Sequence, residues 1–224
     1  VTYINENGKE HWFFESMVMM ELWDDGGNVT YSIANDGKNS STKEHWQRMI
    51  DYWFDDTYGF KALDDCIDEV IGRIGNPPVR RKVVFFLPDA VYFKNYSKGV
   101  KDIDPTTEYW GTIDGNKMDF ARLDHRLKAY RWYIDEICER FAQAGYKHID
   151  LMGFYILSET LTMNGGWNYQ YKQHEDLIPE IADYCHRYDK GLYWIPYCVN
   201  NSLPEHNQGL RNWKNLGIDM TVMQ

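Results

Sequence analysis

The sequence predicts an α/β fold, specifically a (β/α)8 TIM-barrel-like domain of which about five or six strands lie within these 224 residues. Short apolar runs alternate with amphipathic helical segments, which is typical of parallel strands joined by helices. Polar and aromatic residues recur just after the apolar runs. Because five or so strands cannot close an eight-stranded ring, we expect one incomplete barrel domain over 1–224, with the remaining strands outside it.

The first half of the chain is expected to form two strands and two helices. The first strand contains a continuous apolar run from Met17 to Met20, which suits burial on both faces of a parallel sheet. Ser41 and Glu44 have the spacing of a capping box, so we expect a helix to begin there. In chain order, the expected elements are a strand at 12–22, a helix after 41, a helix at 61–74 and a strand at 83–87.

The second half contains the clearest helical pattern. Apolar residues recur every three or four positions between Phe120 and Phe141, with Asp119 as the expected N-cap and Gly145 as the expected stop. A long connection, 90–118, precedes this helix, and connections of that length are usually functional or disordered. The other expected elements are strands at 149–157, 192–195 and 219–223, a helix at 175–188 and a short helix at 205–216.

Composition restricts the classes of partner. The formal net charge of −10 argues against nucleic acid, which needs a basic surface. No apolar run approaches the roughly 18 residues of a membrane span, and the chain shows no signal peptide. The oligomeric state stays open.

Cofactor and redox signals are weak. The seven histidines lack metal-ligand spacing, and no phosphate-binding or dinucleotide-binding glycine pattern occurs, so we expect no metal and no cofactor. The four cysteines form no C-x-x-C pair, and we interpret them as free thiols that serve as small apolar side chains. A disulfide between Cys185 and Cys198 is the alternative.

Glu159 is the most informative acidic residue. It lies just past the expected strand 149–157 and before a loop rich in Gly and Asn. A carboxylate at the carboxyl end of a parallel strand projects into the mouth of an α/β barrel, where such enzymes hold their reactive groups. The alternative is a solvated loop residue that caps the following turn.

Several motifs resemble a bacterial family catalogued as domain of unknown function 4855, and the resemblance extends from Phe14 nearly to the end of the chain. The motifs are Asp119-Phe120 with Arg122, Arg126-Leu127-Lys128-Ala129, Trp132 to Glu136, Gly153-Phe154-Tyr155 before Glu159, Trp194 to Tyr197, and Trp213 to Gln224. The resemblance implies a glycosidase-type (β/α)8 barrel, usually exported, from bacteria that consume polysaccharides. This chain has Glu15-Ser16 where relatives tend to have Asp-Ser.

The resemblance also suggests a role for Glu159. Relatives have a strand before the residue that corresponds to Val1, so the Glu159 strand would be the fourth. Retaining glycosidases of one large group hold their proton donor there and their nucleophile on the seventh strand, which we expect beyond Gln224. Glycoside hydrolysis uses two carboxyl groups that flank the bond to be cleaved. Glu159 is therefore the expected general acid/base of a glycoside hydrolase-like, carbohydrate-active enzyme.

Aromatic and polar residues near strand ends are the expected contacts to a poly- or oligosaccharide. Sugar rings stack their C–H faces on aromatic side chains, and their hydroxyls bind planar polar groups. The expected substrate-binding residues are Trp23, Asp24, Asp89, Trp110, Tyr155, Trp167, Trp194, Tyr197 and Gln224.

Three alternatives stay open for these residues. Glu21, Asp24 and Asp25 end the first strand and could hold a cation or sugar hydroxyls, or they could form a solvated turn. The whole domain could be a glycan-binding barrel without catalysis. It could also be a metal-dependent carbohydrate deacetylase, with Asp24, Asp89 and a loop histidine as ligands.

Overall fold

A parallel sheet of five strands forms the centre of the computed structural model, which describes residues 1–32, 39–90, 110–120, 122–161, 174–198 and 207–223. The spatial order of the strands is β11-β10-β9-β6-β3. Their bounds are β3 Ser16–Met19, β6 Arg81–Leu87, β9 Ile149–Ile156, β10 Gly191–Trp194 and β11 Met220–Thr221.

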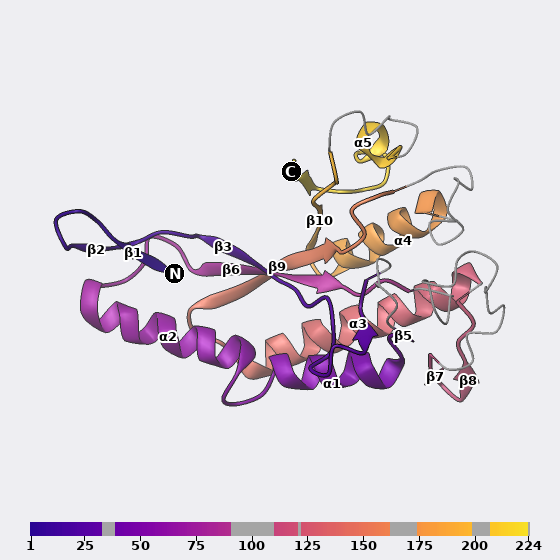
Figure 1. Cartoon of the computed structure of the whole chain (residues 1–224), viewed down its shortest axis with the longest axis horizontal. Helices are drawn as coiled ribbons and strands as arrows, with labels where there is room; N and C mark the ends of the chain where they lie inside the picture. The colour runs from indigo at the N-terminus through magenta and orange to yellow at the C-terminus, as the bar shows by residue number, and fades with distance from the viewer. Residues whose placement is uncertain (33–38, 91–109, 121, 162–173, 199–206, 224) are drawn as a thin grey trace.

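Helices lie mainly on one side of this sheet. In Figure 1, α1, α2 and α3 run beneath β3, β6 and β9, and α4 packs against α3 and β10. The helices of the described residues are α1 Lys43–Trp53, α2 Gly59–Ile74, α3 Leu123–Ala144, α4 His174–Arg187 and α5 Gly209–Asn212.

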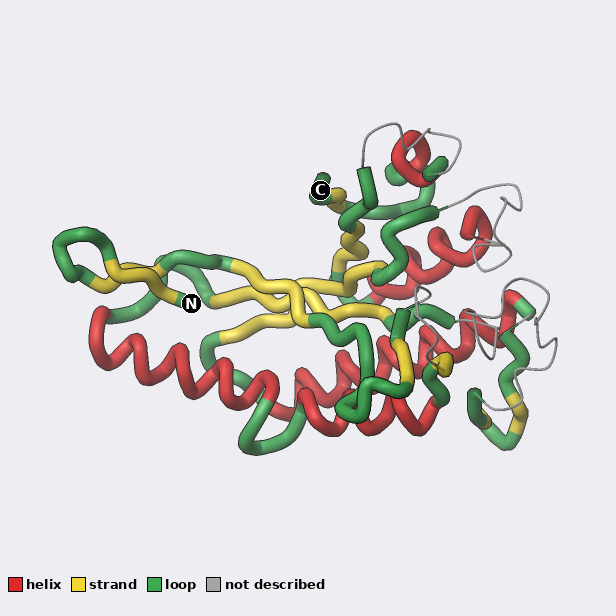
Figure 2. The backbone as a smooth tube through the Cα atoms, in the orientation of Figure 1, coloured by secondary structure: helices red, strands yellow, loops and turns green. Residues whose placement is uncertain are grey.

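Three two-stranded sheets complete the described structure. The antiparallel hairpin β1–β2 projects from one end of the molecule (Figure 2). The pairs are β1 Thr2–Ile4 with β2 Glu10–Trp12, β4 Val29–Thr30 with β5 Asn39–Ser40, and β7 Thr112–Ile113 with β8 Asn116–Lys117.

The predicted (β/α)8 barrel is wrong for this structure. Among the described residues the sheet has five strands and two outer edges, β3 and β11, so it is an open half-barrel and not a closed ring. The alternation of apolar runs with helices does predict parallel pairing, and all four pairings in the sheet are parallel. Closure needs a matched strand number, tilt and stagger, which that periodicity does not encode.

Most of the expected elements are confirmed, but several boundaries differ. The first expected strand is divided, because β2 ends at Trp12 and β3 begins at Ser16. The α1 capping box uses Thr42 and His45, one residue later than expected, since the Ser41 hydroxyl instead accepts a hydrogen bond from Trp46. The other differences are that α3 begins at Leu123, α5 spans only Gly209–Asn212, and 91–109 of the long connection lie outside the described residues.

The helix-facing side of the sheet is packed with aromatic rings. Phe85, in the middle of β6, contacts Trp53 of α1 and Phe60 of α2 at ring-centroid distances of 5.5 Å and 5.4 Å. Tyr133 of α3 stacks on the same ring, and its hydroxyl donates to the Phe86 carbonyl oxygen at 2.9 Å. These contacts join three helices to one strand and place the main core beneath β6.

One extra residue in β9 sets which side chains face the helices. Val83 is paired with Leu151, but the next residue, Val84, is paired with Gly153, so Met152 is a bulge. Because side chains alternate between the two faces of a strand, the bulge reverses the alternation beyond it. Tyr155 therefore lies opposite Phe86, on the face away from the helices.

The four cysteines are free thiols, and the alternative Cys185–Cys198 disulfide is not formed. Cys138 and Cys185 are buried, as expected of small apolar side chains, whereas Cys66 is exposed. Burial raises the pKa of the Cys138 thiol to about 12. The Cys138 thiol is therefore protonated and unreactive at neutral pH.

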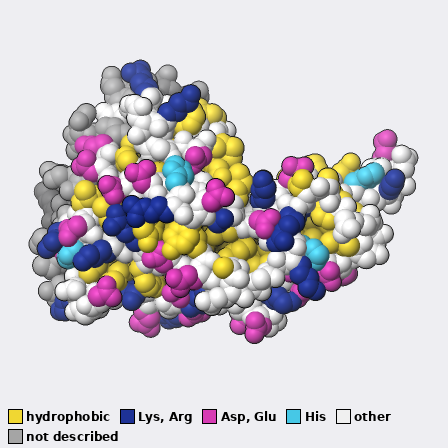
Figure 3. Space-filling view, turned by 180° about the vertical axis from the view of Figure 1, so that it is seen from behind, with side chains coloured by type: hydrophobic (Ala, Val, Ile, Leu, Met, Phe, Trp, Pro, Cys, Tyr) yellow, Lys and Arg dark blue, Asp and Glu magenta, His cyan; other side chains and the backbone are white. Residues whose placement is uncertain are grey.

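The surface carries charges of both signs. Acidic and basic side chains are interspersed on the face shown in Figure 3, with apolar side chains between them. None of the described helices combines the length and the apolar character that crossing a bilayer requires.

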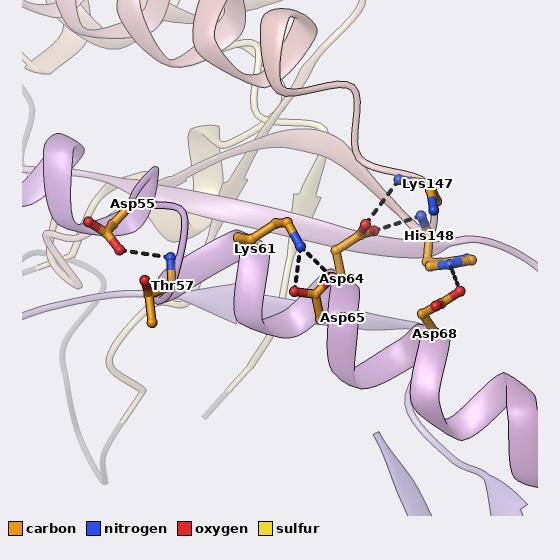
Figure 4. Close-up of polar contacts among 8 residues, drawn as sticks. All are labelled: Asp55, Thr57, Lys61, Asp64, Asp65, Asp68, Lys147 and His148. Atoms are coloured by element: carbon orange, nitrogen blue, oxygen red, sulfur yellow. Dashed lines mark hydrogen bonds and ion pairs between the residues drawn. The ribbon is translucent and has the colours of Figure 1, made fainter.

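A buried carboxylate fixes the start of β9 against α2. Asp64 accepts hydrogen bonds from the backbone N–H groups of Lys147 and His148, at 3.2 Å and 2.7 Å (Figure 4). The His148 ring also lies 2.9 Å from an Asp68 oxygen, one helical turn further along (Figure 4). The N–H groups of Lys147 and His148 thus both depend on the Asp64 carboxylate as their acceptor.

We expect Asp64→Ala to lower the free energy of unfolding by about 1–3 kcal/mol, because two part-buried N–H groups lose their acceptor. Asp65→Ala is the matched control. Asp65 is exposed on the same helix and pairs only with Lys61, so its loss should cost under about 0.5 kcal/mol. Urea denaturation followed by circular dichroism measures both, and equal midpoints would contradict the role of Asp64.

Arg81 is a charged side chain that is buried. It is 1% exposed, and its guanidinium lies 4.8 Å from the centre of the Trp12 ring. None of its three side-chain nitrogens has a hydrogen-bond partner among the described residues. Burial lowers the pKa of this guanidinium, so its charge is held at a cost in stability.

Replacing Arg81 by Met should therefore raise the free energy of unfolding by about 1 kcal/mol, since unpaired buried donors are removed and the volume is kept. Arg80→Met should have the opposite effect. The exposed Arg80 donates to two backbone carbonyl oxygens, of Tyr146 and Ile149, and pairs with Asp150 at 3.0 Å. Thermal unfolding distinguishes the two variants, and a loss of stability in Arg81→Met would refute the cost assigned to that charge.

Candidate functional site

The carboxyl ends of three neighbouring strands meet at one edge of the sheet. Ile156 at the end of β9 is paired with Leu87 of β6 and with Trp194 of β10, so the three ends are level. Asp89 follows the end of β6, Glu159 that of β9 and Tyr197 that of β10. Since adjacent strands lie about 4.8 Å apart, these predicted site residues occupy neighbouring positions.

The backbone of Glu159 is fixed from two sides. Its carbonyl oxygen accepts a hydrogen bond from the Tyr197 N–H at 3.0 Å and another from the Asn207 side-chain amide at 2.9 Å. The Asn207 amide oxygen in turn accepts the Leu161 N–H at 3.0 Å. The Glu159 side chain is only half-buried, so a rigidly held backbone presents it at the edge.

Asn207 is a residue that the sequence did not single out. It is buried, and its one side chain contacts the segments that follow β9 and β10. An amide supplies both a donor and an acceptor, which this junction requires. The only sequence signal is an Asn just before a short helix, and that is common in loops of every kind.

Tyr155 connects the two strand-end carboxylates electrostatically. It is 3% exposed, and burial raises its pKa to about 12, with further contributions from the negative charges of Glu159 and Asp89. Both carboxylates therefore lie close enough to act on a single phenol. Tyr155 keeps its proton at neutral pH and is a hydrogen-bond donor there.

Asp89 lies deeper than Glu159. Its backbone N–H donates to the Tyr31 carbonyl oxygen at 2.8 Å, which holds the segment after β3 against the end of β6. Burial, followed by the negative charge of Asp89, raises the pKa of the Tyr130 phenol, whose oxygen accepts the Ala90 N–H at 3.0 Å. The negative charge of Asp89 thus acts on two buried phenols, those of Tyr130 and Tyr155.

The predicted aromatic contacts are divided between core and surface. Trp194 is fully buried, and its indole N–H donates to the Ser158 carbonyl oxygen at 2.8 Å, so it supports the edge from below. Trp110 is also buried, packed on Trp46 at a ring-centroid distance of 5.1 Å. Trp23 and Tyr197 are each 46% exposed. Trp167 and Gln224 lie outside the described residues.

Asp24 closes the loop that follows β3. One of its carboxylate oxygens accepts the backbone N–H groups of Asn28 and Val29, both at 2.8 Å. This hydrogen bonding matches the turn that the sequence left open as an alternative. The Asp24 carboxylate nevertheless also lines a cavity.

That cavity, here called the β3 pocket, has a volume of about 240 Å³. Burial raises the pKa of the Glu21 carboxyl, and burial together with Glu21, Asp24 and Asp25 raises that of the Tyr31 phenol. Burial and Arg48 lower the pKa of His45, so its imidazole is neutral at pH 7. The pocket is lined in part by Glu21, Asp24, Asp25, Tyr31, His45 and Arg48.

The carboxyl, phenol and imidazole groups of the β3 pocket can donate and accept hydrogen bonds. Within the described ranges, no three His, Cys, Asp or Glu side chains are grouped so that they could hold a metal ion. The deacetylase alternative, which uses Asp24, Asp89 and a histidine as shared ligands, therefore gains no support from these side chains.

Comparison with known proteins gives a single result. Searches of curated proteins and of solved structures find no match. Residues 1–224 match the family described as Domain of unknown function (DUF4855), which agrees with the motifs around Phe120, Tyr155 and Trp194. The chain belongs to the DUF4855 family.

Proposed function

We propose that the protein is a carbohydrate-active enzyme of the glycoside hydrolase type, with Glu159 as general acid/base. The observation that supports this most is the position of the Tyr155 phenol in the field of both Glu159 and Asp89, at the ends of neighbouring parallel strands. Export from a polysaccharide-consuming bacterium, which the family resemblance implies, would bring such an enzyme to its substrate.

In this proposal Glu159 protonates the glycosidic oxygen as the bond breaks. The reaction also needs a second carboxyl group, roughly 5–5.5 Å away for retention of configuration or about 6.5–9.5 Å for inversion. Asp89, on the neighbouring strand, is assigned as the electrostatic partner and as a ligand of a sugar hydroxyl. A half-buried Glu159 beside a more deeply buried Asp89 gives the two acids different surroundings, which is how such pairs acquire different roles.

Tyr155 is assigned a positioning role. Because its pKa is about 12, the phenol stays protonated at neutral pH and can donate a hydrogen bond to a carboxylate or to a substrate oxygen. The exposed rings of Tyr197 and Trp23 are assigned to stacking against sugar faces. The buried Asn207 holds the backbone beneath Glu159 and Tyr197.

We expect Glu159→Gln to reduce product release from the susceptible polysaccharide by about 10²–10⁴-fold, the usual contribution of a positioned general acid. Asp89→Asn should also lower activity. The control is Glu69→Gln, which removes an exposed carboxylate from α2. Reducing-end assays on a polysaccharide panel measure the three variants and the parent protein.

Equal product release by the parent and Glu159→Gln would remove Glu159 from the mechanism. Binding of a glycan without any product from the parent protein would favour the non-catalytic, glycan-binding alternative. Circular dichroism spectra that match the parent would show that each variant is folded.

The raised pKa of Tyr155 predicts how the stability of the protein changes at alkaline pH. Its folded pKa of about 12 exceeds the unfolded value of 10.0, so the stability it contributes is complete below pH 10 and is lost as the pH rises to about 12. This shift corresponds to about 2–3 kcal/mol. Tyr155→Phe has no proton to lose at this position, and its stability should fall less between pH 9 and pH 12. Urea midpoints across that range test this, and parallel declines would contradict it.

A further inference from the structure

We propose that the free edge of β3, residues 14–21, binds an extended peptide segment that has an apolar centre and basic ends. Such a segment would add a strand to the sheet. The inference concerns a protein partner and does not rest on the proposed function. Its support comes from the open side of β3, the exposed apolar side chains along it and the acidic residues at its ends.

One side of β3 has no neighbouring strand in the described sheet. On the other side lies β6, where Lys82 donates its backbone N–H to the Glu15 carbonyl oxygen at 2.9 Å (Figure 1). Backbone groups of successive residues point to opposite sides of a strand, so those of Ser16 and Val18 point away from β6. Backbone groups along such an edge are a template for pairing with another strand.

The side chains along this edge are apolar and exposed. Phe14, Val18 and Met20 are 53%, 42% and 42% exposed, and their even spacing places them on one face of the strand. Val18 is paired with Val84, so this is the face of the sheet away from the helices. Edge strands usually prevent pairing with charges or proline, but 16–20 contain neither. An apolar strand therefore fits this edge.

The ends of the β3 edge are acidic. Glu15 lies near its start and Glu21 at its end, with Asp24 and Asp25 just beyond. Residues 10–32 contain no Lys or Arg. A partner that carries cations at both ends would complement these carboxylates.

Cations of the neighbouring elements do not lie on the free side of β3. Lys82 and Arg81 belong to β6, on the opposite side of the strand, and Arg81 is buried in the field of Glu15. Arg48 comes from α1 and lines the β3 pocket. The acidic ends thus keep their negative character toward a strand that approaches from the open side.

A second copy of the chain fits this edge less well. In an antiparallel pair of two β3 strands, the start of one strand lies beside the end of the other, so Glu15 approaches the Glu21 of the second copy. Symmetry gives two such contacts, and like charges on facing strands are destabilising. The formal net charge of −10 adds a longer-range repulsion between copies. The acidic ends therefore favour a basic partner over self-pairing.

The side-chain alternation of β3 defines the pattern of the partner. Side chains opposite Glu15 and Glu21 lie on one face of the added strand, and those opposite Ser16, Val18 and Met20 lie on the other. A suitable peptide is Lys-Val-Thr-Val-Thr-Val-Lys, which places its lysines beside the two glutamates and its valines on the apolar face. The peptide reads the same in both directions, so it fits parallel and antiparallel pairing alike.

The test is binding of this peptide, labelled and with blocked ends, to the full chain by fluorescence anisotropy. A matched peptide with Glu in place of both lysines should bind at least about tenfold more weakly, because two attractive contacts become repulsive. Added salt should reduce the difference between the two peptides.

N-methylated peptides distinguish strand pairing from simple apolar contact. The amides of the central valine and of a neighbouring threonine point to opposite sides of the peptide, so only one of them faces β3. Methylation of the facing amide should weaken binding by about 2–10-fold, whereas methylation of the other should have little effect. The sensitive amide identifies the direction of pairing.

Val18→Lys places a charge on the edge and should weaken binding of the lysine peptide at least about tenfold. The control is Val222→Lys, at a residue that is 48% exposed beyond β11, at the other end of the sheet. That variant should bind the peptide as the parent protein does. Circular dichroism spectra that match the parent would show that both variants are folded.

Four results would overturn the inference. Three concern the peptides: equal affinity for the Lys and Glu forms, equal effects of the two methylations, and binding that survives Val18→Lys. The fourth is a dimer in sedimentation experiments that Val18→Lys dissociates, since the edge would then bind a second copy. None of these measurements depends on cleavage of a polysaccharide, so the proposed function is judged separately.

Discussion

The pairing of β6 with β9, including its one-residue bulge at Met152, is the constraint on which the strand-end site depends. In an unbroken register, Val84 would pair with Met152 and Phe86 with Phe154, and the Tyr155 phenol would point into the helix-side core. The bulge reverses the alternation. It leaves Phe154 to pack beneath the sheet and places Tyr155 on the other face, where Asp89 and Glu159 act on it.

Many of the aromatic residues pack beneath the paired strands β6 and β9. Below β6, Trp46, Trp53, Phe60 and Tyr133 form a set of ring contacts that is joined through Phe85. At the carboxyl edge, the Trp194 indole N–H donates to the Ser158 carbonyl oxygen. Rings packed to this density resist displacement, because any shift forfeits many small contacts at once. The edge is therefore a rigid platform. Rigidity matters there, since a reacting carboxylate has to be held in a defined position relative to its partner.

Local features of this fold could be predicted from sequence, whereas features that depend on several segments could not. The apolar periodicity of α1, α2 and α4 and the buried runs of β6 and β9 lie where expected, because each pattern specifies its own element. Strand closure, the direction of Trp110 and Trp194, and the junction at Asn207 depend on distant partners. The β3 pocket is of the same kind, since Glu21 follows β3 while His45 and Arg48 come from α1.

The carboxyl edge brings buried phenols close to carboxylates. Tyr31, Tyr130 and Tyr155 are buried near carboxylates, and burial together with those negative charges raises the pKa of each phenol and so favours its protonated form. Arg48 and Arg126 act in the opposite sense on Tyr31 and Tyr130, so these two cations partly offset the negative field. Arg48 is the one cation among the described lining residues of the β3 pocket. Under the proposed function, sugar hydroxyls would donate hydrogen bonds to the carboxylates at this edge.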